Sequence, residues 1–548
     1  MNAVSADEVM SGSVPEGLRI RRVPLGGSAL SQAAQRGDVA DWYARCPRSV
    51  AEWRAHADTV RTAHRQDWLA PLAPAFAATG RAADRLTRAA AGGAVVTTGQ
   101  QPGLFGGPAY TFSKAMSALA LADALEGALG LPVAPVFWAA TDDADWMEAA
   151  VTHVATARGL VTASLVGPAT DGLALSDVPL GDLTAARAAL VSACGSAAHA
   201  GVLELIDAAY VPHATIGGAY LQLLRALLEP LGVAVLDASH PALRAAADPF
   251  LRQALRRSGA VQTALQARTH AIAAKGYAPQ VDVVDGLSLV FRTQLESVGT
   301  TAQRSRQRVP LEGTAAAARE AEPGTLGANV LLRPVLERSL LPTVCYLAGP
   351  GEYAYFAQVT PVAEALEAAV PVAAPRWAAE VLETRVLERQ VTLGLDDAVL
   401  RDPHAAEQNI ARARLDETVA DTFERLRVTL DAQVRTLGES LGGEESPVAP
   451  ETVQGLTRDL THTLDRFERR LLAGVKRREA EAMREVAALR AALRPNGASP
   501  ERVLNLMPLL VRYGTGLLPA MARAAGDHAT TLVHRGVAAP SVETAGAP

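Results

Sequence analysis

A chain of 548 residues with 49% hydrophobic and 20% charged side chains can bury a large core, and its length predicts two to four domains. The net charge of −6 argues against a nucleic-acid partner, because phosphate contacts need a basic surface. Cys46, Cys194 and Cys345 are too far apart for a metal or redox motif, so we expect reduced thiols. We see no signal peptide in residues 1–9 and no apolar run of transmembrane length, and therefore expect a soluble, cytoplasmic protein without a membrane partner.

The beginning of the chain predicts a tail followed by helices. Residues 1–25 have the composition of a loose tail. From about residue 30 to residue 90, apolar positions such as Trp42, Trp53 and Trp68 recur at helical spacing. We therefore assign residues 1–90 to an N-terminal tail and a helical lead-in.

A glycine-rich segment, Thr97–Tyr110, organises the next part of the chain. A short apolar strand, Ala94–Val96, precedes it and a helix, Thr111–Leu129, follows it. This layout builds anion or nucleotide sites, because glycines admit a ligand close to the backbone and the first helical N–H groups lack intrahelical partners. The segment matches neither G-x-G-x-x-G nor a Walker A sequence. Gln100 and Gln101 both donate and accept, which favours a polar substrate, and a simple tight turn is the alternative.

A second strand, Val133–Ala140, runs into an acidic cluster formed by Asp142, Asp143 and Asp145. In an open α/β sheet, ligands bind at this end of the strands. Crowded like charges should also raise the pKa of at least one of these carboxyl groups. A solvated loop with a helix N-cap is the alternative.

The middle of the chain predicts further strands and helices. A strand-rich insert and a helix are expected in residues 160–200, a strand at Val233–Leu236, and one long helix from Leu243 to about Lys275. Asp285 and Gly286 are expected to form the turn of a hairpin between residues 280–284 and 287–291. Three arginines that alternate with polar residues follow: Arg304, Arg306 and Arg308. We interpret them as a solvated edge, and a clamp for a phosphate or carboxylate is the alternative.

Another strand, Thr343–Leu347, leads into a second glycine-rich loop, Ala348–Tyr355. Three strands, ending near residues 98, 140 and 347, thus carry polar loops at the same kind of end. On one parallel sheet these loops converge, which predicts a binding site.

The character of the sequence changes after Trp377. Apolar residues step by three or four through residues 415–441 and again through residues 460–493, and charged residues fill the gaps. The segment Gly442–Pro447 separates the two runs. This pattern predicts an antiparallel helical hairpin with coiled-coil spacing, which we interpret as a structural arm or dimer contact.

The chain resembles the cysteine ligases of bacillithiol biosynthesis, the BshC family. The resemblance runs from about residue 90 to residue 520 and rests on ordered blocks: Thr98–Lys114, Pro135–Trp138, Leu236–Leu243, Asn329–Pro334, Gly349–Tyr355 and Glu501–Leu506. It implies an α/β fold, with a Rossmann-like parallel sheet core that carries insertions, plus a C-terminal α-helical coiled-coil arm that forms a homodimer. We therefore expect the core in residues 91–400, the arm in 401–500, and C-terminal helices in 501–548 with a disordered tail from His528.

The reaction implied by the resemblance joins L-cysteine to the amine of glucosaminyl-malate and gives bacillithiol, a low-molecular-weight thiol. The sequence departs from the family at one position, because Ala144 stands where the family usually has the histidine of Glu-Asp-His-Asp. If that histidine is catalytic, this chain either uses another base or has changed chemistry, and the next histidine is His153.

Amide formation from a free carboxylate needs activation, and we expect ATP or another nucleotide to supply it. The expected catalytic residues are Asp142, Asp143, Asp145 and Lys114; the carboxylates could serve as base, ammonium site or metal ligands, and Lys114 could instead be a surface residue. Arg333 is a candidate for the malyl carboxylates, because a guanidinium pairs with a carboxylate in two places. The full set of expected substrate- or nucleotide-binding residues is Gly99, Gln100, Gln101, Gly103, Gly107, Tyr110, Asn329, Arg333, Gly349, Gly351, Glu352 and Tyr353.

Two other functions remain open from the sequence. A nucleotidyl or group transferase could use the same core without cysteine. A non-catalytic scaffold could keep the fold and bind partners through the coiled coil, although the glycine-rich loops argue for a working site.

Overall fold

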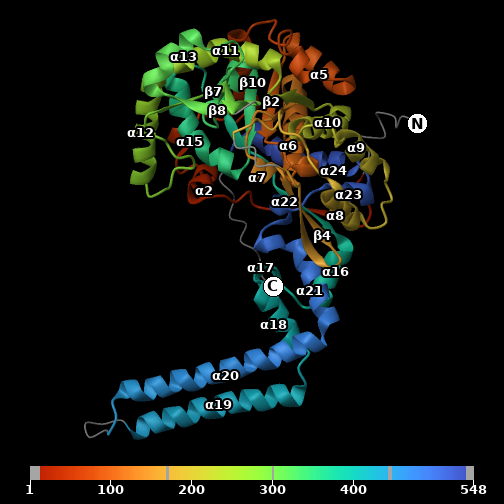
Figure 1. Ribbon diagram of the computed structural model, residues 1–548, viewed down its shortest axis with the longest axis vertical. Coiled ribbons are helices and arrows are strands. Elements are labelled where there is room, and N and C mark those ends of the chain that lie inside the picture. Colours follow the sequence, from red (N-terminus) through yellow and green to blue (C-terminus); the bar gives the residue numbers. More distant parts are fainter. Residues whose placement is uncertain (1–12, 168–171, 299–300, 442–446, 538–548) are drawn as a thin grey trace. The chain divides into compact units, whose positions relative to one another are not determined.

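The computed structural model describes residues 13–167, 172–298, 301–441 and 447–537. The chain divides into two compact units (Figure 1). Unit 1 contains residues 1–154, 162–381 and 501–548, and unit 2 contains residues 155–161 and 382–500. Among the described residues, no helix combines the length and the apolar character that crossing a membrane requires.

A five-stranded parallel sheet forms the centre of unit 1. Its strands lie in the order β11-β10-β2-β3-β6, and each neighbouring pair is parallel. Numbered along the chain, these five strands have the order 5-4-1-2-3, which is the Rossmann arrangement. The predicted α/β, Rossmann-like core is confirmed. The strand bounds are β2 Ala94–Gln100, β3 Val133–Ala139, β6 Ala234–Asp237, β10 Thr343–Ala348 and β11 Ala373–Pro375.

The sheet is covered on both faces, and its sequence shows why. Every residue of β3 is buried, as expected for a continuous apolar run in a parallel sheet. Helix α5 (Gly80–Ala90) packs against β2, β3 and β6, and α6 (Tyr110–Leu129) packs against β2, β3 and β10. Alanine and leucine make α6 both a good helix former and apolar on all sides.

The C-terminal helices α24 (Leu517–Ala524) and α25 (Gly526–Arg535) pack on α6 within unit 1. The expectation of a disordered tail from His528 is therefore wrong as far as residue 537, because Ala529, Leu532 and Val533 of α25 are buried. The rest of that expected tail, residues 538–548, lies outside the described residues.

The N-terminal lead-in is helical as predicted, with Trp53 of α3 (Val50–Ala63) fully buried. The expected loose tail is wrong for β1 (Leu18–Arg22), which pairs with β12 (Ala379–Glu383). The Arg21 guanidinium also donates to the Glu380 carboxylate, with 2.6 Å between Nη2 and Oε2. Strand β1 therefore has a partner that only the distant chain supplies.

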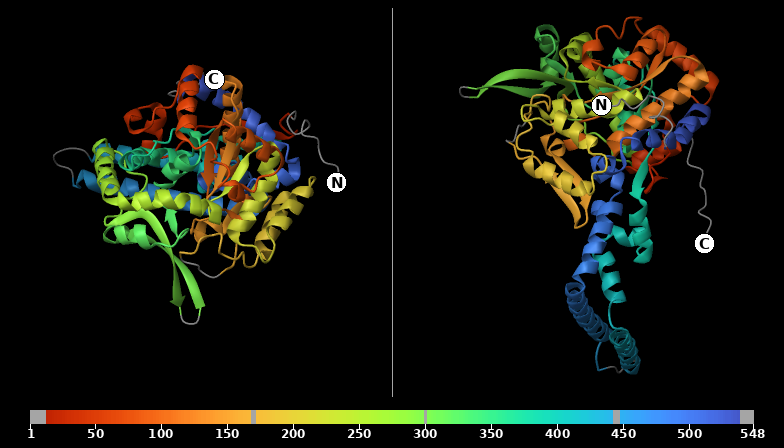
Figure 2. Two further views of the ribbon diagram at one scale, coloured as in Figure 1. Left: turned by 90° about the horizontal axis from the view of Figure 1, so that it is seen from above. Right: turned by 90° about the vertical axis from the view of Figure 1, so that its right-hand side faces the viewer.

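The predicted hairpin of residues 280–291 is wrong. Strand β7 (Leu287–Val298) pairs instead with β8 (Thr301–Pro310) on one side and with β9 (Leu326–Ala328) on the other. The amide of Gln358 satisfies both the N–H and the C=O of Val281, so that backbone needs no strand partner. The β7–β8 hairpin projects from unit 1 (Figure 2).

The predicted long helix of residues 243–275 is two helices, α11 (Pro241–Arg256) and α12 (Ser258–Ala274). At the break, the Arg257 side chain donates to the carbonyl of Ala365 and pairs with Glu367.

The expected insert contains β4 and β5 followed by helices. The remaining unit 1 elements are α2 Ala29–Arg36, η1 Ala40–Trp42, α4 Ala73–Phe76, η2 Leu104–Gly106, α7 Trp146–Ala149, β4 Val151–Thr156, β5 Gly159–Ser164 (the tip of the β4–β5 hairpin belongs to unit 2), α8 Thr184–Cys194, α9 Gly201–Ala209, α10 Ile216–Leu228, η3 Glu229–Leu231, η4 Leu311–Gly313, α13 Thr314–Glu320, α14 Arg333–Leu340, α15 Pro350–Ala365, α22 Pro500–Val503 and α23 Met507–Tyr513.

Unit 2 is helical and contains the predicted coiled-coil arm. Its helices are α16 Thr384–Thr392, α17 Asp397–Arg401, α18 Pro403–Ala413, α19 Glu417–Ser440, α20 Pro450–Arg478, α21 Ala480–Leu493 and the short turn η5 Pro495–Gly497. Phe423 stacks on Phe467 at 6.1 Å between ring centroids, and Arg427 pairs with Asp465. The residue numbers in contact rise along α19, from 423 to 427, while they fall along α20, from 467 to 465. The two helices are therefore antiparallel.

We predict that this hairpin mediates a homodimer. Val419, Leu426, Leu437, Leu456 and Phe467 are 40–57% exposed on α19 and α20, and apolar surface repeated along a helix pair favours association. Light scattering after size exclusion should give a dimer at micromolar protein.

A double variant, Leu426→Lys with Phe467→Lys, should give a monomer, whereas Val391→Lys, a control at an exposed residue of α16, should remain a dimer. A wild-type monomer at micromolar concentration would contradict the prediction.

Candidate active site

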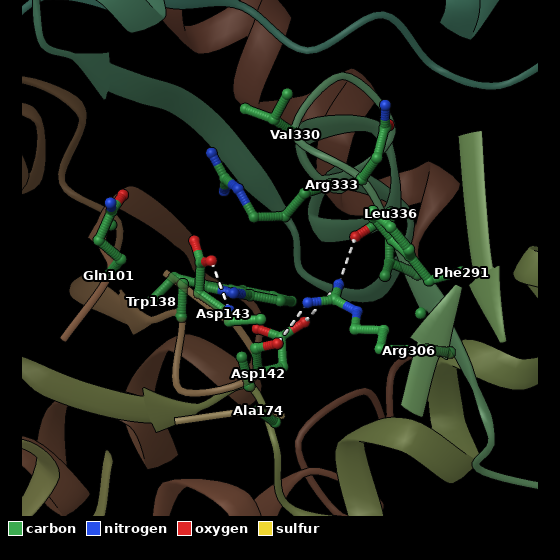
Figure 3. A pocket seen from close by; sticks show the side chains of 18 of the residues that line it. Gln101, Trp138, Asp142, Asp143, Ala174, Phe291, Arg306, Val330, Arg333 and Leu336 are labelled. Carbon is green, nitrogen blue, oxygen red and sulfur yellow. Dashed lines mark hydrogen bonds and ion pairs between the residues drawn. The ribbon is translucent and has the colours of Figure 1, made fainter. Parts of the chain in front are cut away.

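A pocket of about 550 Å³ lies at the carboxyl ends of β2 and β3. Gly99, Gln100 and Gln101 line it from β2, and Trp138 and residues 140–144 from β3. Residues of α11, of the β7–β9 sheet and of the segment 326–336 complete the wall (Figure 3). The pocket therefore forms where ligands bind in open α/β sheets.

A buried ion pair joins the two predicted glycine-rich loops beside this pocket. Lys114 of α6 and Glu352 of α15 approach to 2.6 Å. The Lys114 ammonium also donates to the carbonyl of Gly99 at 2.7 Å and to the side-chain oxygen of Gln100 at 2.8 Å. Three N–H donors thus meet three acceptors. Lys114 is 4% exposed, so the alternative of a surface lysine is wrong.

The pKa values follow from this arrangement. Burial lowers the pKa of Lys114, and Glu352 opposes the shift. Burial by itself would raise the pKa of Glu352, but Lys114 and Arg333 hold it below its usual range. The Glu352 carboxylate also accepts from the backbone N–H of Gly349 at 2.7 Å and from the Tyr346 hydroxyl. Gly349 therefore serves to cap α15.

The first glycine-rich loop is closed on itself. A Cβ on Gly103 would lie 2.7 Å from the Cα of Gly107, and Gly107 has a φ of +74°. The backbone N–H of Gly107 donates to the carbonyl of Leu104. These two glycines do not line the pocket; they allow the loop to fold tightly, and only Gly99–Gln101 face the pocket.

Asn505, which lies after α22, clamps this loop. Its side-chain amide donates to the carbonyls of Leu104 and Phe105 and to the Thr152 hydroxyl, each at 3.1 Å. Asn505 is 4% exposed, and its Oδ1 accepts from the N–H of Met507 at 2.8 Å. The block Glu501–Leu506 thus belongs to the support of the loop, a role that no local sequence signal reveals.

The acidic cluster separates into different roles. Asp142 and Asp143 line the pocket, whereas Asp145 is exposed and caps α7, its Oδ1 accepting from the N–H of Glu148. The Oδ1 atom of Asp143 accepts from the N–H groups of Ala144 and Asp145. Burial, and then the charge of Asp142, raises the pKa of Asp143, as crowding predicted.

The sequence did not single out Glu148, which extends this cluster. Gln101 donates to the Glu148 carboxylate at 2.5 Å between Nε2 and Oε2. Burial raises the pKa of Glu148, and the charges of Asp145 and Asp143 add to the shift. The D-x-x-E spacing from Asp145 to Glu148 is a helix-start signal that could have drawn attention to it.

Arg306 faces the acidic cluster, so its expected position on a solvated edge is wrong. Its guanidinium donates to the backbone carbonyl of Asp142 and to the carbonyl of Ala328, and it lies 3.6 Å from the Asp142 carboxylate (Figure 3). Arg308 also lines the pocket and donates to the carbonyl of Ser288. Both arginines point inward because β8 pairs with β7. The side chain of Arg304 lies outside the described residues.

Arg333 lines the pocket and is held in place from behind. Its guanidinium donates to the Glu337 carboxylate at 2.9 Å, and to the hydroxyls of Tyr346 and Tyr355. Glu337 in turn accepts from the hydroxyl of Thr97 on β2. Asn329, which also lines the pocket, accepts from the N–H groups of residues 331 and 332 and so begins α14.

Several other expected site residues do not line the pocket. The Tyr110 hydroxyl accepts from the Gln100 amide at 3.2 Å and so supports the wall indirectly. Gly351 is half-buried beside Gln280. Tyr353 points into the core and stacks on Tyr43 at 5.2 Å. His153 contacts Thr162 away from the pocket, with 3.1 Å between Nδ1 and Oγ1. Within the described part of the chain, no His, Cys, Asp or Glu residues form a metal-binding group.

Comparison with known proteins agrees with this architecture. Residues 31–377 match the family model of the BshC N-terminal Rossmann-like domain of bacillithiol biosynthesis, and residues 383–531 match the model of the BshC C-terminal coiled-coil domain. This chain belongs to the BshC family.

Relatives in this family match along most of their length. A protein of Solibacter usitatus is 30% identical over 499 residues, which cover 87% of this chain and 91% of the relative. A Geobacillus thermodenitrificans protein is 29% identical, with 77% of this chain and 80% of the relative covered. Both relatives are named "Putative cysteine ligase BshC".

The support behind Arg333 predicts a pH dependence of stability. Burial raises the pKa of Glu337 from 4.5 to about 7, although Arg333 and Thr97 act in the opposite direction. The folded chain thus holds the Glu337 proton up to a higher pH than the unfolded chain. This contribution to stability is full below about pH 4.5 and is lost as the pH rises through about 7.

A glutamine at position 337 stays neutral at every pH. We therefore expect Glu337→Gln not to lose this contribution to the free energy of unfolding as the pH rises. The free energy of unfolding of the variant minus that of the wild type, from urea titrations, should increase between pH 5 and pH 8. Glu322→Gln, at an exposed position in the same unit, is the control and should show no such trend. Parallel curves for wild type and Glu337→Gln would contradict the shifted pKa.

Proposed function

We propose that this chain joins the carboxyl group of L-cysteine to the amine of glucosaminyl-malate and so forms an amide. Membership of the BshC family and the names of the relatives support the cysteine ligase activity. The observation that carries the proposal is the pocket itself. It places two carboxylates, Asp142 and Asp143, opposite a guanidinium, Arg306, at the carboxyl ends of β2 and β3.

Asp143 is the proposed general base. Its Oδ1 is fixed by two backbone N–H groups, and its Oδ2 has no partner among the described residues. The raised pKa makes this carboxylate a better proton acceptor near neutral pH. As the amine attacks the activated carbonyl of cysteine, the C–N bond forms, the leaving group departs with its electron pair, and Asp143 takes the proton from nitrogen. This assignment compensates for alanine at position 144.

Asp142 is proposed to bind the substrate while its amine is still an ammonium. That ammonium must release one proton to solvent before the free amine can attack, and the proton that Asp143 takes is the second one. Asp142 lines the pocket, and the Arg306 guanidinium lies 3.6 Å from its carboxylate. Arg306 also fixes the backbone of Asp142. The hairpin β7–β8 therefore contributes to the position of Asp142.

A nucleotide is proposed to supply the leaving group for the cysteine carboxylate. In the first glycine-rich loop, the N–H groups of Gly106 and Gly107 donate within the loop and that of Ala109 donates to Leu504, so these three do not bind phosphate. The first turn of α15 is the proposed phosphate site, because no described acceptor takes the N–H groups of Gly351 and Glu352.

Reconstitution tests this function directly. Purified chain, L-cysteine and glucosaminyl-malate should give the amide product by mass spectrometry when ATP is present, with little product when ATP is omitted. Phosphorus NMR of the same reaction identifies the nucleotide product. Product formation without any nucleotide would overturn the activation step, and no product under either condition would overturn the ligase function.

We predict that Asp143→Asn lowers kcat by about 10²–10⁴-fold, as removal of a general base does. Asparagine keeps the acceptor for both N–H groups and removes a buried charge, so thermal stability should change little. Asp84→Asn, at an exposed residue of α5, is the control and should keep wild-type kcat. A fall of less than about tenfold would be too small for a base, and Asp142→Asn and His153→Gln would then be tested.

A further inference from the structure

Four arginines line the pocket, and they differ in what their guanidinium groups contact. Arg306 donates to two backbone carbonyls and faces Asp142. Arg308 donates to the carbonyls of β7, and Arg333 uses three of its five N–H donors on protein oxygens. Arg244, by contrast, has no hydrogen-bond or ion-pair partner for its side chain within the part of the chain that the structure describes. It therefore offers its complete set of donors to a ligand.

The position of Arg244 suits a receptor for an anion. It lies near the start of α11, directly after β6, and it is half-buried. Its neighbours on the pocket wall are apolar: Leu243, Ala247 and Leu251 of the same helix. Apolar surroundings lower the effective dielectric constant, so the guanidinium attracts an anion more strongly there than in bulk water.

The same pocket is also lined by a neutral hydrogen-bond donor, Asn329. Asn329 spends its Oδ1 on the N–H groups of residues 331 and 332. Its amide nitrogen has no acceptor among the described residues. A guanidinium and an amide N–H₂ together supply the donors that a carboxylate requires.

Both proposed substrates carry carboxylates, but their fates differ. The cysteine carboxylate reacts and loses its charge when the amide forms. The malyl carboxylates keep their charge throughout the reaction. A permanent ion pair fits the group whose charge does not change, because a strong pair with the reacting carboxylate would stabilise the ground state against the transition state.

We propose that Arg244 binds the malyl carboxylates of glucosaminyl-malate and thereby determines specificity for that substrate, an inference that rests on the proposed function. Arg333, which the sequence suggested for this role, then contributes a fixed positive charge to the pocket wall. The amine of the substrate reaches Asp142 and Asp143 from this anchor.

Calorimetric titration of the full-length protein tests the assignment. The ligands are glucosaminyl-malate and methyl glucosaminide, which keeps the sugar and its amine but lacks the malyl carboxylates. The variants are Arg244→Gln, Arg244→Lys and the control Arg256→Gln, an exposed residue of the same helix without a described side-chain partner. Steady-state KM values for cysteine and ATP are measured on the same proteins.

We expect Arg244→Gln to weaken binding of glucosaminyl-malate about 10- to 100-fold, the usual effect of losing a charge-assisted pair. Arg244→Lys should lie between this variant and wild type, because lysine keeps the charge but not the planar fork. Binding of methyl glucosaminide, the KM values for cysteine and ATP, and all properties of Arg256→Gln should match wild type.

Other outcomes overturn the assignment in distinguishable ways. If wild type and Arg244→Gln bind glucosaminyl-malate equally, Arg244 is not the anchor, although the proposed function stands. If the KM for cysteine or ATP rises instead, the carboxylate of cysteine or the phosphates of the nucleotide are the anion. If Arg244→Gln weakens the binding of glucosaminyl-malate and of methyl glucosaminide equally, Arg244 does not bind the malyl carboxylates. If wild type does not bind glucosaminyl-malate, the proposed function and this inference fall together.

Discussion

The buried ion pair between Lys114 and Glu352 is the constraint on which the site of this protein depends. Taking two charges out of water costs several kcal/mol per ion, and only complete hydrogen bonding offsets that cost. Here the ammonium has three acceptors, and the carboxylate accepts from Gly349 and Tyr346 as well. Because β2 and β10 are neighbours in the sheet, the pair fixes the starts of α6 and α15 at the point where the strand order reverses.

Distant parts of the chain support this centre. Asn505 holds the first glycine-rich loop through two carbonyls, and Glu501 of the same block forms a buried ion pair with Arg376 at 2.6 Å. The Arg376 side chain lies close to Gly349 in the second loop. The C-terminal block therefore supports both loops within unit 1: it contacts the first directly and the second through Arg376.

The pocket contains both acidic and basic side chains, and the proposed chemistry assigns a different role to each. Asp142 and Asp143 follow β3, where burial, and then the charge of Asp142, raises the pKa of Asp143, the proposed base. Arg306 faces them from the hairpin, while Arg244 stands on α11 without a described partner. A substrate that carries both an amine and carboxylates would find groups of opposite charge for each of them in this pocket.

The sequence by itself determined the parallel strands, the polar loops at their carboxyl ends and the coiled-coil hairpin, because hydrophobic periodicity and glycine placement are local signals. It also placed Asp142, Asp143, Gln100 and Arg333 in one site, since the carboxyl ends of parallel strands meet at one edge. Only the tertiary structure decided that Lys114 is buried, that β7 pairs with β8 and turns Arg306 inward, and that Asn505 clamps a loop some 400 residues before it. Those outcomes depend on contacts between distant segments, and whether a charged side chain has a partner is a property of the folded neighbourhood rather than of the residues beside it in sequence.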